Sequence, residues 1–381
     1  MTVYTIMKNR IGIVGGGQLG RMLAFEAKKM GFVVSVTDPT PQSPAGQVSD
    51  HQIVADYQDE KAIRELAKRS DFLTFEVELA NAKILDELSE QGLQVNPSAK
   101  TLTIIKDKLK QKDFLAKVGI PVAEFLQVTT RTDIINAGMK FGYPMLLKAR
   151  FDAYDGRGNA LVSSPKDIEV GLEKLKGRDL YVEKFVPFVK ELAIMVARNA
   201  KGEIKTYSVV ETMHKNNICH TVLAPAPVSA LVKKRAKNVA IMVMKHLKGA
   251  GVFGIEMFLT KDKNVLINEI APRVHNSGHY TIEGAFTSQF EQHIRAIAGL
   301  PLGSTELTHP AIAMVNILGE RTGDVQVTGI EKALAIPGVS VHIYGKAQTK
   351  VERKMGHITA VGKTIDEAHK KAKRARKMIS I

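Results

Sequence analysis

The residues with the clearest chemical potential lie between Asn268 and Tyr280. This stretch combines a carboxylate, an arginine, two histidines and several hydrogen-bonding side chains. Arginine recognises carboxylate and phosphate groups, and a neighbouring carboxylate can hold a divalent cation. Just upstream, apolar runs at 254–259 and 264–269 flank the polar segment 260–263, which predicts a β-hairpin. The pattern indicates an anion-binding site beside a metal-binding carboxylate.

The predicted hairpin brings two glutamates together. If its turn is centred between Asp262 and Lys263, Glu256 lies opposite Glu269, and the two-residue period of a strand puts both on one face. Two facing carboxylates destabilise a sheet unless a cation lies between them, and Mg²⁺ is bound by one or two carboxylates together with substrate phosphates. We therefore predict a magnesium site at Glu256 and Glu269. The alternative is an exposed hairpin whose glutamates face water.

A glycine-rich turn follows the first predicted strand, residues 11–14. Its sequence, Gly15-x-Gly-x-x-Gly20, matches the dinucleotide fingerprint, and Asp38 ends the second strand. The same turn and helix N-terminus hold any phosphate, and Gln18 offers its amide to a small ligand. The turn therefore leaves three interpretations open: a nicotinamide dehydrogenase, another phosphate or small-ligand site, or glycines needed only for packing of the strand against the helix.

Two downstream stretches suit a nucleotide. Lys148 ends a predicted strand and precedes the glycine loop 154–159, which contains an arginine and suits a polyphosphate. The apolar strand 181–186 could stack against an adenine and bond it through its backbone, with Glu191 beyond it to accept ribose hydroxyls. The alternative for Glu183 and Glu191 is a surface salt bridge to a neighbouring lysine.

Two single side chains are ambiguous. Glu76 ends the strand predicted at 71–76, at the edge where ligands of parallel sheets bind. It could accept a hydrogen bond from a substrate amine, or it is an ordinary carboxylate at a helix N-terminus. His214 has no chemical partner nearby in the sequence, and a lone histidine is more often structural than catalytic.

Composition bounds the class of protein. The chain has 381 residues, 44% hydrophobic and 24% charged, as expected for a globular enzyme of two or three domains. Its one cysteine, Cys219, excludes an intramolecular disulfide framework and a multi-cysteine zinc site, and it fits a reducing cytoplasm. No signal peptide and no membrane-spanning apolar run is legible, so we expect a cytoplasmic protein without a membrane partner.

Net charge is +15 and favours anionic partners. Part of it lies in the basic run 370–377, which has two interpretations: a nucleic-acid patch, or the solvated face of a final helix that begins at 366–368. We favour the helix face and predict no nucleic-acid partner, because the run lacks interleaved aromatic residues and no binding module is legible.

The order of elements predicts an α/β protein. Alternating strands and helices over 1–100 indicate a Rossmann-like domain with a parallel sheet. A single helix is expected over 98–118. Residues 101–300 are expected to form a second domain, which contains a small α+β subdomain at 121–190 and helices at 229–248 and 288–298. Residues 301–381 are expected to form a small β-rich C-terminal domain with a final helix.

In this order, the motifs resemble the ATP-grasp superfamily. Within it, the chain is similar to the 5-(carboxyamino)imidazole ribonucleotide synthetases over residues 11–357. The most specific matches are the segments 15–23, 154–158 and 268–279, which read GGGQLGRML, YDGRG and NEIAPRVHNSGH. The resemblance implies an ATP-grasp fold in which residues 121–190 are a lid subdomain.

The resemblance also implies a reaction: ATP, bicarbonate and aminoimidazole ribonucleotide give the N-carboxylated ribonucleotide, ADP and phosphate, through carboxyphosphate. Phosphoryl transfer is catalysed mainly by positioning and charge neutralisation. Mg²⁺ would be held by Glu256 and Glu269. The residues implied to contact ATP are Lys108, Lys148, Tyr154, Asp155, Gly156, Arg157, Gly158, Asn159, Glu183, Lys184, Phe185, Val186, Glu191, His214, Asn268 and Glu269.

A second set of residues is implied for the ribonucleotide and bicarbonate. It comprises Gln18, Leu19, Glu76, Tyr154, Asp155, Arg273, His275, Asn276, Ser277, Arg353 and Lys354. Within it, Asp155, Arg273, His275 and Lys354 are the expected catalytic residues. A homodimer is the family expectation. The chain departs from the family at Ala153, usually glycine, and at Asn159, often glutamine; alanine resists positive φ, so the closed loop could differ slightly.

Three other functions remain open at this point. The first is an ATP-grasp ligase acting on a different amine. The second is the nicotinamide dehydrogenase, which leaves the motifs of 148–280 unexplained. The third is a nucleic-acid-binding protein, which rests on charge alone.

Overall fold

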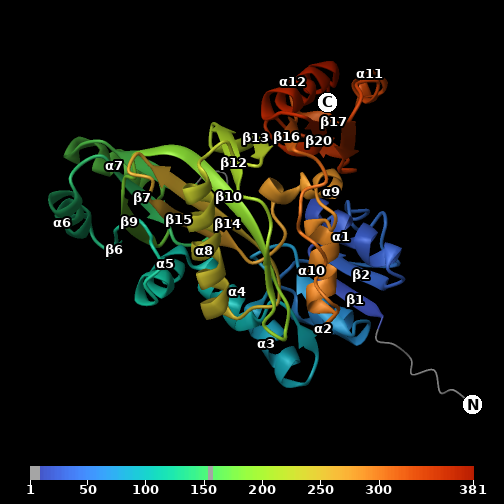
Figure 1. Cartoon of the computed structure of the whole chain (residues 1–381). Helices are drawn as coiled ribbons and strands as arrows, with labels where there is room; N and C mark the ends of the chain where they lie inside the picture. The colour runs from blue at the N-terminus through green and yellow to red at the C-terminus, as the bar shows by residue number, and fades with distance from the viewer. Residues whose placement is uncertain (1–8, 153–157) are drawn as a thin grey trace, which may run out of the picture.

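The computed structural model describes residues 9–152 and 158–381. In Figure 1 the N-terminal sheet with its helices lies on one side and the subdomain of β6–β9 on the other, with a large sheet between them. The C-terminal strands and the final helix α12 lie above the N-terminal part. The mixed α/β architecture and the N-terminal parallel sheet were predicted from the sequence.

The N-terminal sheet has five parallel strands in the order β3-β2-β1-β4-β5. Its elements are β1 (Arg10–Val14), α1 (Gln18–Lys29), β2 (Val33–Asp38), β3 (His51–Val54), α2 (Glu60–Lys68), β4 (Phe72–Phe75), α3 (Ala82–Glu90) and β5 (Gln94–Val95). The strand β3 and the helix α2 were not predicted. β3 has only four residues, none of them buried, and α2 buries only Ala62, Ile63 and Leu66, so neither has a strong apolar period.

The single helix expected over 98–118 is wrong, because two helices occupy the region. They are α4 (Ala99–Lys106) and α5 (Lys108–Lys117). Between them Asp107 has extended backbone angles, and its side chain accepts hydrogen bonds from the N–H groups of Leu109 and Lys110, which caps α5. Arg150 pairs with the same carboxylate at 2.6 Å. This distant partner fixes the break.

A four-stranded antiparallel sheet in the order β6-β9-β7-β8 lies in the region 121–190, where a small α+β subdomain was predicted. Its elements are β6 (Phe125–Val128), α6 (Arg131–Phe141), β7 (Met145–Ala149), β8 (Asn159–Val162), α7 (Ile168–Lys174) and β9 (Leu180–Lys184). Ile134, Leu147, Val162 and Ile168 are among the buried side chains that pack the helices onto the sheet.

The largest sheet has nine strands and runs from the hairpin to the C-terminal region. Its order is β15-β14-β10-β12-β13-β16-β20-β18, with β11 paired to β10. The strands are β10 (Phe188–Arg198), β11 (Ile204–Thr206), β12 (Val210–Lys215), β13 (Ile218–Ala224), β14 (Gly251–Thr260), β15 (Val265–Ala271), β16 (Ala311–Leu318), β18 (Val339–Ile343) and β20 (Lys354–Gly362). The C-terminal strands thus continue the central sheet through the β13–β16 ladder.

Helices cover this sheet. The predicted helices at 229–248 and 288–298 are present as α8 (Ala230–Leu247) and α10 (Gln289–Ile297), capped by Ser229 and Ser288. The final helix is α12 (Ile365–Met378), which buries Ala368, Ala372 and Ala375 against the C-terminal strands. The remaining short elements are η1 (Pro165–Asp167), η2 (Asn276–Gly278), α9 (Thr281–Gly284), β17 (Gly323–Asp324), α11 (Ile330–Leu334) and β19 (Gln348–Thr349).

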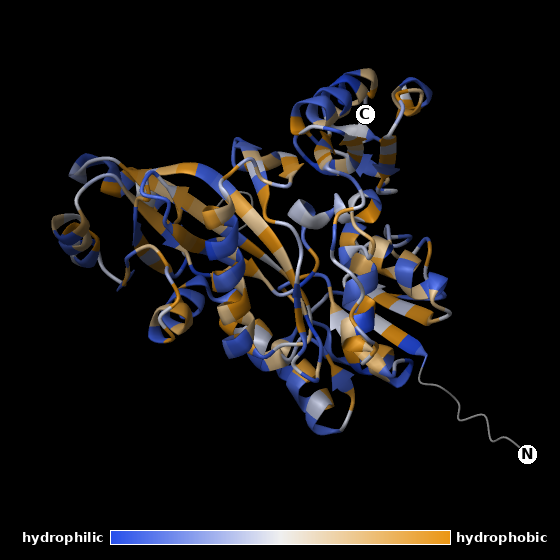
Figure 2. Cartoon of the chain, in the orientation of Figure 1, coloured by the Kyte–Doolittle hydropathy of each residue, from blue (hydrophilic) through white to orange (hydrophobic). Residues whose placement is uncertain are grey.

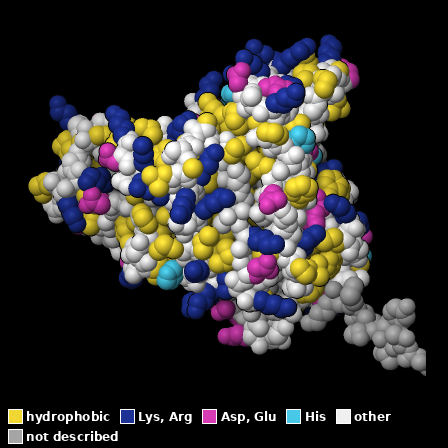
Figure 3. All heavy atoms as spheres, in the orientation of Figure 1, with side chains coloured by type: hydrophobic (Ala, Val, Ile, Leu, Met, Phe, Trp, Pro, Cys, Tyr) yellow, Lys and Arg dark blue, Asp and Glu magenta, His cyan; other side chains and the backbone are white. Residues whose placement is uncertain are grey.

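Hydropathy follows this architecture. Apolar residues gather on the strands and on the inner helix faces in Figure 2, whereas α12 shows a largely hydrophilic outer surface. Lysine and arginine side chains are spread over the visible face in Figure 3 rather than gathered in one stripe. No helix within residues 9–152 and 158–381 is long and apolar enough to cross a membrane.

Candidate active site

The hairpin of β14 and β15 pairs Glu256 with Glu269, as predicted. Nearer the turn, Met257 pairs with Ile267, so Asn268 is the extra residue of a β-bulge. The turn is therefore centred half a residue earlier than expected, and the bulge restores the facing pair. It also leaves Asn268 and Glu269, consecutive in sequence, both outside the buried core.

The two facing carboxylates have different electrostatic surroundings. Lys108, at the start of α5, lies 2.7 Å from Glu269, and although burial opposes the charge, this lysine lowers the pKa of the Glu269 carboxyl. Burial and the like charge of Glu269 raise the pKa of Glu256. The site therefore carries one stabilised negative charge and a second carboxylate that a cation would ionise.

These residues fit Mg²⁺ in a specific way. Within the described parts of the chain, no group of three or more His, Cys, Asp and Glu side chains is placed to hold a metal. A cation at Glu256 and Glu269 would therefore need phosphate oxygens and water for its remaining positions. Mg²⁺ is bound in this manner by enzymes that act on nucleotides.

Lys148 and Glu183 belong to a buried charge cluster. Lys148 Nζ lies 3.5 Å from Glu183 Oε1, and Lys112 Nζ of α5 lies 3.0 Å from the other oxygen. Burial opposes the charges, but the two lysines lower the pKa of Glu183. The side chain of Glu183 thus orients Lys148, and only the backbone of this strand is left for the predicted adenine contact. The salt-bridge alternative for Glu183 is present, in a buried form.

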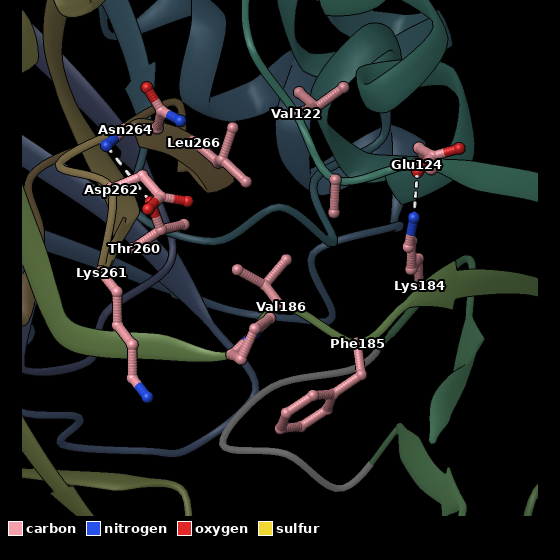
Figure 4. A pocket seen from close by; sticks show the side chains of 12 residues that line it. Val122, Glu124, Lys184, Phe185, Val186, Thr260, Lys261, Asp262, Asn264 and Leu266 are labelled. Carbon is pink, nitrogen blue, oxygen red and sulfur yellow. Dashed lines mark hydrogen bonds and ion pairs between the residues drawn. The ribbon is translucent and has the colours of Figure 1, made fainter. Parts of the chain in front are cut away.

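A cavity of about 460 Å³ borders the segment that follows β9. Figure 4 shows Val186 and Phe185 at its centre, the turn of the hairpin on one side and an ion pair of Lys184 with Glu124, 2.5 Å apart, on the other. Its walls combine apolar side chains, among them Val122 and Leu266, with polar and charged side chains such as Lys261 and Asp262. Apolar surface with a few polar groups is the usual lining of a small-molecule site, and the predicted adenine contacts Lys184, Phe185 and Val186 are among the residues that line this cavity.

Glu191 and His214 face each other across β10 and β12. His214 Nδ1 lies 2.6 Å from Glu191 Oε2. Burial disfavours the imidazolium, but the bond to Glu191 outweighs it and raises the pKa of His214. Glu256 contributes to this rise, which places His214 near the hairpin carboxylates. His214, which has no partner nearby in the sequence, is therefore paired with Glu191 and lies near Glu256 in the fold.

The segment after β15 supplies Arg273 and His275. Arg273 pairs at 2.9 Å with Glu78, which comes from the loop after β4. His275 Nδ1 accepts hydrogen bonds from Ser277, whereas its Nε2 lies 3.7 Å from Glu256. The ring proton is therefore assigned to Nε2. Burial, with Arg273 next, lowers the pKa of His275 well below its ordinary value, so the ring is a neutral hydrogen-bond donor.

Asn276 and Ser277 are buried next to this histidine. The amide of Asn276 forms two hydrogen bonds with the amide of Asn316 on β16, at 3.0 and 2.7 Å. Most of the hydrogen-bonding capacity of Asn276 is thus used inside the protein. A direct contact of this side chain with substrate stays a prediction.

The Glu76 side chain binds the backbone of the glycine turn 15–20. Both carboxylate oxygens accept backbone N–H groups of the turn, from Gly17 and, at 2.7 Å, from Gly20. The N-terminus of α1, which a dinucleotide phosphate would occupy, thus already holds an internal carboxylate, and burial raises the pKa of Glu76. Gln18 lies half-buried at the start of α1, whereas the Leu19 side chain packs in the hydrophobic core.

The C-terminal region contributes Lys354, the first residue of β20. Its positive charge disfavours the protonated forms of His275 and His214, although the pKa of His214 is raised overall by Glu191. Lys354 therefore lies near both rings. The neighbouring Arg353 is exposed and donates to the carbonyl of Gln348 at 2.7 Å. Residues 153–157, which include Tyr154, Asp155, Gly156 and Arg157, lie outside the described residues. Asn159 is the first residue of β8 and pairs with Lys148, and the carbonyl of the preceding Gly158 accepts the Ala149 N–H.

Four functional candidates were not predicted: Lys112, Glu78, Gln289 and Asn316. Lys112 is almost fully buried although it lies in a helix rich in lysines, and no local pattern distinguishes it. Glu78 had a signal, because it follows Glu76 at a sheet edge. Gln289 and Asn316 are neutral amides whose importance depends on distant partners.

Three family models match consecutive parts of the chain. The ribonucleotide synthetase preATP-grasp domain matches residues 7–106, the ATP-grasp domain residues 113–290, and the phosphoribosylaminoimidazole carboxylase C-terminal domain residues 312–371. A crystal structure titled N5-carboxyaminoimidazole ribonucleotide synthetase, from Thermotoga maritima, is 50% identical, covers 98% of this chain and 99% of its own, and has a TM-score of 0.89. An Aspergillus clavatus synthase in complex with ADP and 5-aminoimidazole ribonucleotide is 39% identical, covers 97% and 98%, and has a TM-score of 0.90.

Curated relatives fall into two lengths. The N5-carboxyaminoimidazole ribonucleotide synthase of Bacillus subtilis is 39% identical over 94% of this chain and 92% of the relative. A phosphoribosylaminoimidazole carboxylase of Ogataea methanolica is 44% identical over 95% of this chain but only 68% of the relative. The chain thus spans about two thirds of the length of the fungal relatives, 65% in Candida albicans.

Proposed function

The chain belongs to the family of N5-carboxyaminoimidazole ribonucleotide synthases, and on this premise we propose that it carboxylates the amine of 5-aminoimidazole ribonucleotide in purine biosynthesis. The reaction consumes ATP and bicarbonate and gives ADP and phosphate. The observation that carries the proposal is the clustering of Lys108, Lys148 and Arg273 around the paired Glu256 and Glu269, with His275 3.7 Å from Glu256. Phosphate-binding and anion-binding groups meet there.

The first step joins bicarbonate to the γ-phosphate. A bicarbonate oxygen attacks the γ-phosphorus and the bond between this phosphorus and the β-phosphate oxygen breaks. The products of this step are carboxyphosphate and ADP. Lys108 and Lys148 are suited to neutralise phosphate oxygens. The hydrogen bond to Glu191 raises the pKa of His214 and so favours its protonated form, which would add a positive charge near the phosphates. Mg²⁺ held by Glu256 and Glu269 would supply further charge neutralisation.

The second step forms the carbon–nitrogen bond. Carboxyphosphate releases carbon dioxide and phosphate, the substrate amine attacks carbon, and the nitrogen loses a proton. Arg273, fixed by Glu78, is suited to hold bicarbonate or the carboxylate product. The Nε2–H group of His275 is suited to donate a hydrogen bond to the same oxygens without adding charge.

The Glu76 arrangement disfavours the dehydrogenase hypothesis, because its carboxylate occupies the turn that would bind a dinucleotide phosphate. The proposal retains the adenine contact of Lys184, Phe185 and Val186 at the cavity of Figure 4. It also retains the ribonucleotide contacts of Gln18, Arg353 and Lys354, and the loop contacts of residues 154–159. A homodimer and a cytoplasmic location remain predictions, the former to be tested by sedimentation of the purified chain.

The decisive experiment measures ADP release from magnesium-ATP at controlled bicarbonate, with and without 5-aminoimidazole ribonucleotide. We expect rapid release only when the ribonucleotide and bicarbonate are both present, with label from bicarbonate appearing in the acid-labile product. Release that ignores the ribonucleotide but responds to another amine would instead assign the chain to a different ATP-grasp ligase.

A further inference from the structure

The segment His275–His279, here called the histidine loop, contacts three elements: β14, α10 and β16. It follows β15 and contains η2. Its first residue packs directly on β14, since a Cβ atom added at Gly254 would lie 2.5 Å from the Cβ of His275. This contact places the loop two residues from the metal-site carboxylate Glu256.

Gln289, the first residue of α10, binds the loop through its side-chain amide. Its Oε1 accepts the His275 N–H at 2.9 Å, and its Nε2 donates to the His275 carbonyl at 2.8 Å. The same Nε2 lies 3.2 Å from His279 Nδ1. Gly278 leaves room for the amide, because a Cβ there would lie 2.4 Å from Gln289 Oε1. Gln289 is fully buried.

Asn316 of β16 also binds the loop. Besides the two bonds to the Asn276 amide, its Nδ2 donates to the carbonyl of Cys219 at 2.8 Å, which ties the loop to β13. Its exposed fraction is 2%. Asn316 also pairs with His357 in the β16–β20 ladder, so the C-terminal strands and the histidine loop share a continuous set of contacts.

We propose that Gln289 and Asn316 are positioning residues that hold the His275–Asn276 segment in the conformation needed for the ribonucleotide and bicarbonate. The proposal rests on the function proposed above. Two neutral amides suit this role because they fix the backbone without adding a charge near the phosphates. An apolar residue of similar size at position 289 leaves the part-buried His275 N–H without its acceptor and leaves the His275 carbonyl with only the Gly278 N–H as a backbone donor, so the loop must move to satisfy the N–H group.

The test compares Gln289→Met with Gln292→Met. Gln292, one turn along the same helix, is also fully buried and also makes two bonds to a backbone, with the carbonyl and N–H of Gly303 at 3.0 and 2.7 Å. It therefore controls for the loss of a buried glutamine on α10 at a distance from the loop. We would measure the melting temperature, the Kd for ATP by calorimetry, and kcat and KM for the ribonucleotide and for bicarbonate.

We expect Gln289→Met to raise the KM for the ribonucleotide or bicarbonate at least about tenfold, since small misplacements of binding groups have large effects. ATP affinity should change less than about twofold in both variants. Gln292→Met should lower the melting temperature with KM unchanged. Equal kinetic effects in the two variants, or a purely thermal effect of Gln289→Met, would overturn the proposal.

A second variant covers failure of Gln289→Met to fold. Asn316→Ser keeps a hydroxyl group at the position but loses the reciprocal amide pair, and it should show the same change in KM to a smaller degree. Wild-type protein decides the separate question of function: if it shows no turnover dependent on the ribonucleotide while still binding ATP, the proposed function fails irrespective of these variants.

Discussion

At the scale of single residues, the hairpin glutamates show how charge is arranged before any cation binds. Lys108 stabilises the charge on Glu269, while Glu256 faces that charge with a raised pKa. A divalent cation between them would lower the pKa of Glu256 and compete with Lys108 for Glu269. Lys108 would then be released toward the phosphates, so cation binding and phosphate binding would support each other.

Glu269→Gln should keep the fold and lower magnesium-dependent turnover by two or more orders of magnitude, roughly the effect of leaving phosphoryl charge unneutralised. The variant also frees Lys108 from its partner, so ATP should still bind. Steady-state kinetics across a magnesium titration would measure the loss. Glu203→Gln, at an exposed turn beyond β10, is the matched control and should behave as wild type; near-normal turnover of Glu269→Gln would remove this residue from the metal site.

The pairing of His214 with Glu191 predicts a pH dependence. A raised pKa means that the charged pair is complete below the ordinary histidine pKa of about 6.5 and is lost as pH rises through the higher folded-state value. We expect the KM for ATP to rise on the alkaline side of that value. His214→Gln should have a higher KM that no longer follows this step, and a wild-type step retained in the variant would contradict the assignment.

At the scale of elements, the break between α4 and α5 determines where Lys108 points. The Asp107 carboxylate caps α5 and pairs with Arg150, whose carbonyl accepts the Lys108 N–H at 2.9 Å. Lys108, the first residue of α5, follows the extended Asp107 directly and pairs with Glu269 at 2.7 Å. The helix break is therefore part of the active-site geometry.

Asp107→Ala removes both the cap of α5 and the buried carboxylate that pairs with the half-buried Arg150. We expect the free energy of unfolding to fall on the order of 3 kcal/mol and the KM for ATP to rise. Asp59→Ala, which removes a cap from α2 without an ion pair, is the control and should cost about 1 kcal/mol with unchanged kinetics. Chemical denaturation measures the first effect, and equal losses in the two variants would refute the role of Arg150.

The sequence predicted those elements whose information is local. The facing glutamates followed from strand period and turn position, although the bulge at Asn268 was invisible and shifted the turn. The helices α8 and α10 were predicted, and each has a local signal in the serine N-cap that precedes it. The break at Asp107 was missed because Arg150 lies 43 residues away, and β3 was missed because its residues are half-exposed. The site residues named from family motifs stay predictions, whereas the amides that hold them depend on tertiary contacts.

At the scale of the whole molecule, His293 joins three parts of the protein. From α10, its Nδ1 accepts the Val252 N–H of β14 at 3.1 Å, so its Nε2 donates to Thr74 of the N-terminal sheet at 2.9 Å. Burial lowers the pKa of His293 to about 3. A protonated ring would lose the Val252 contact, so the neutral form is required for this junction.

This junction predicts acid sensitivity. With a depressed pKa, His293 contributes stability that is present above pH 6.5 and is lost as pH falls toward 3. Wild-type protein should therefore take up a proton at this site when it unfolds in mild acid. His293→Gln should be less stable at neutral pH but should take up about one proton fewer on unfolding, which denaturation across pH would measure. An unchanged slope would show that the histidine is not the titrating group.

The ladder between β13 and β16 limits where the chain can be cut to produce a stable recombinant fragment. Four residue pairs, from Thr221–Val315 to Ala224–Ile312, carry the sheet from the ATP-grasp region into the C-terminal strands. A recombinant fragment that stops near residue 304 would leave β13 with a row of unsatisfied N–H and C=O groups and an apolar flank. Such an open edge recruits strands from other molecules, so the fragment should precipitate or form inclusion bodies, and useful expression boundaries lie beyond β20.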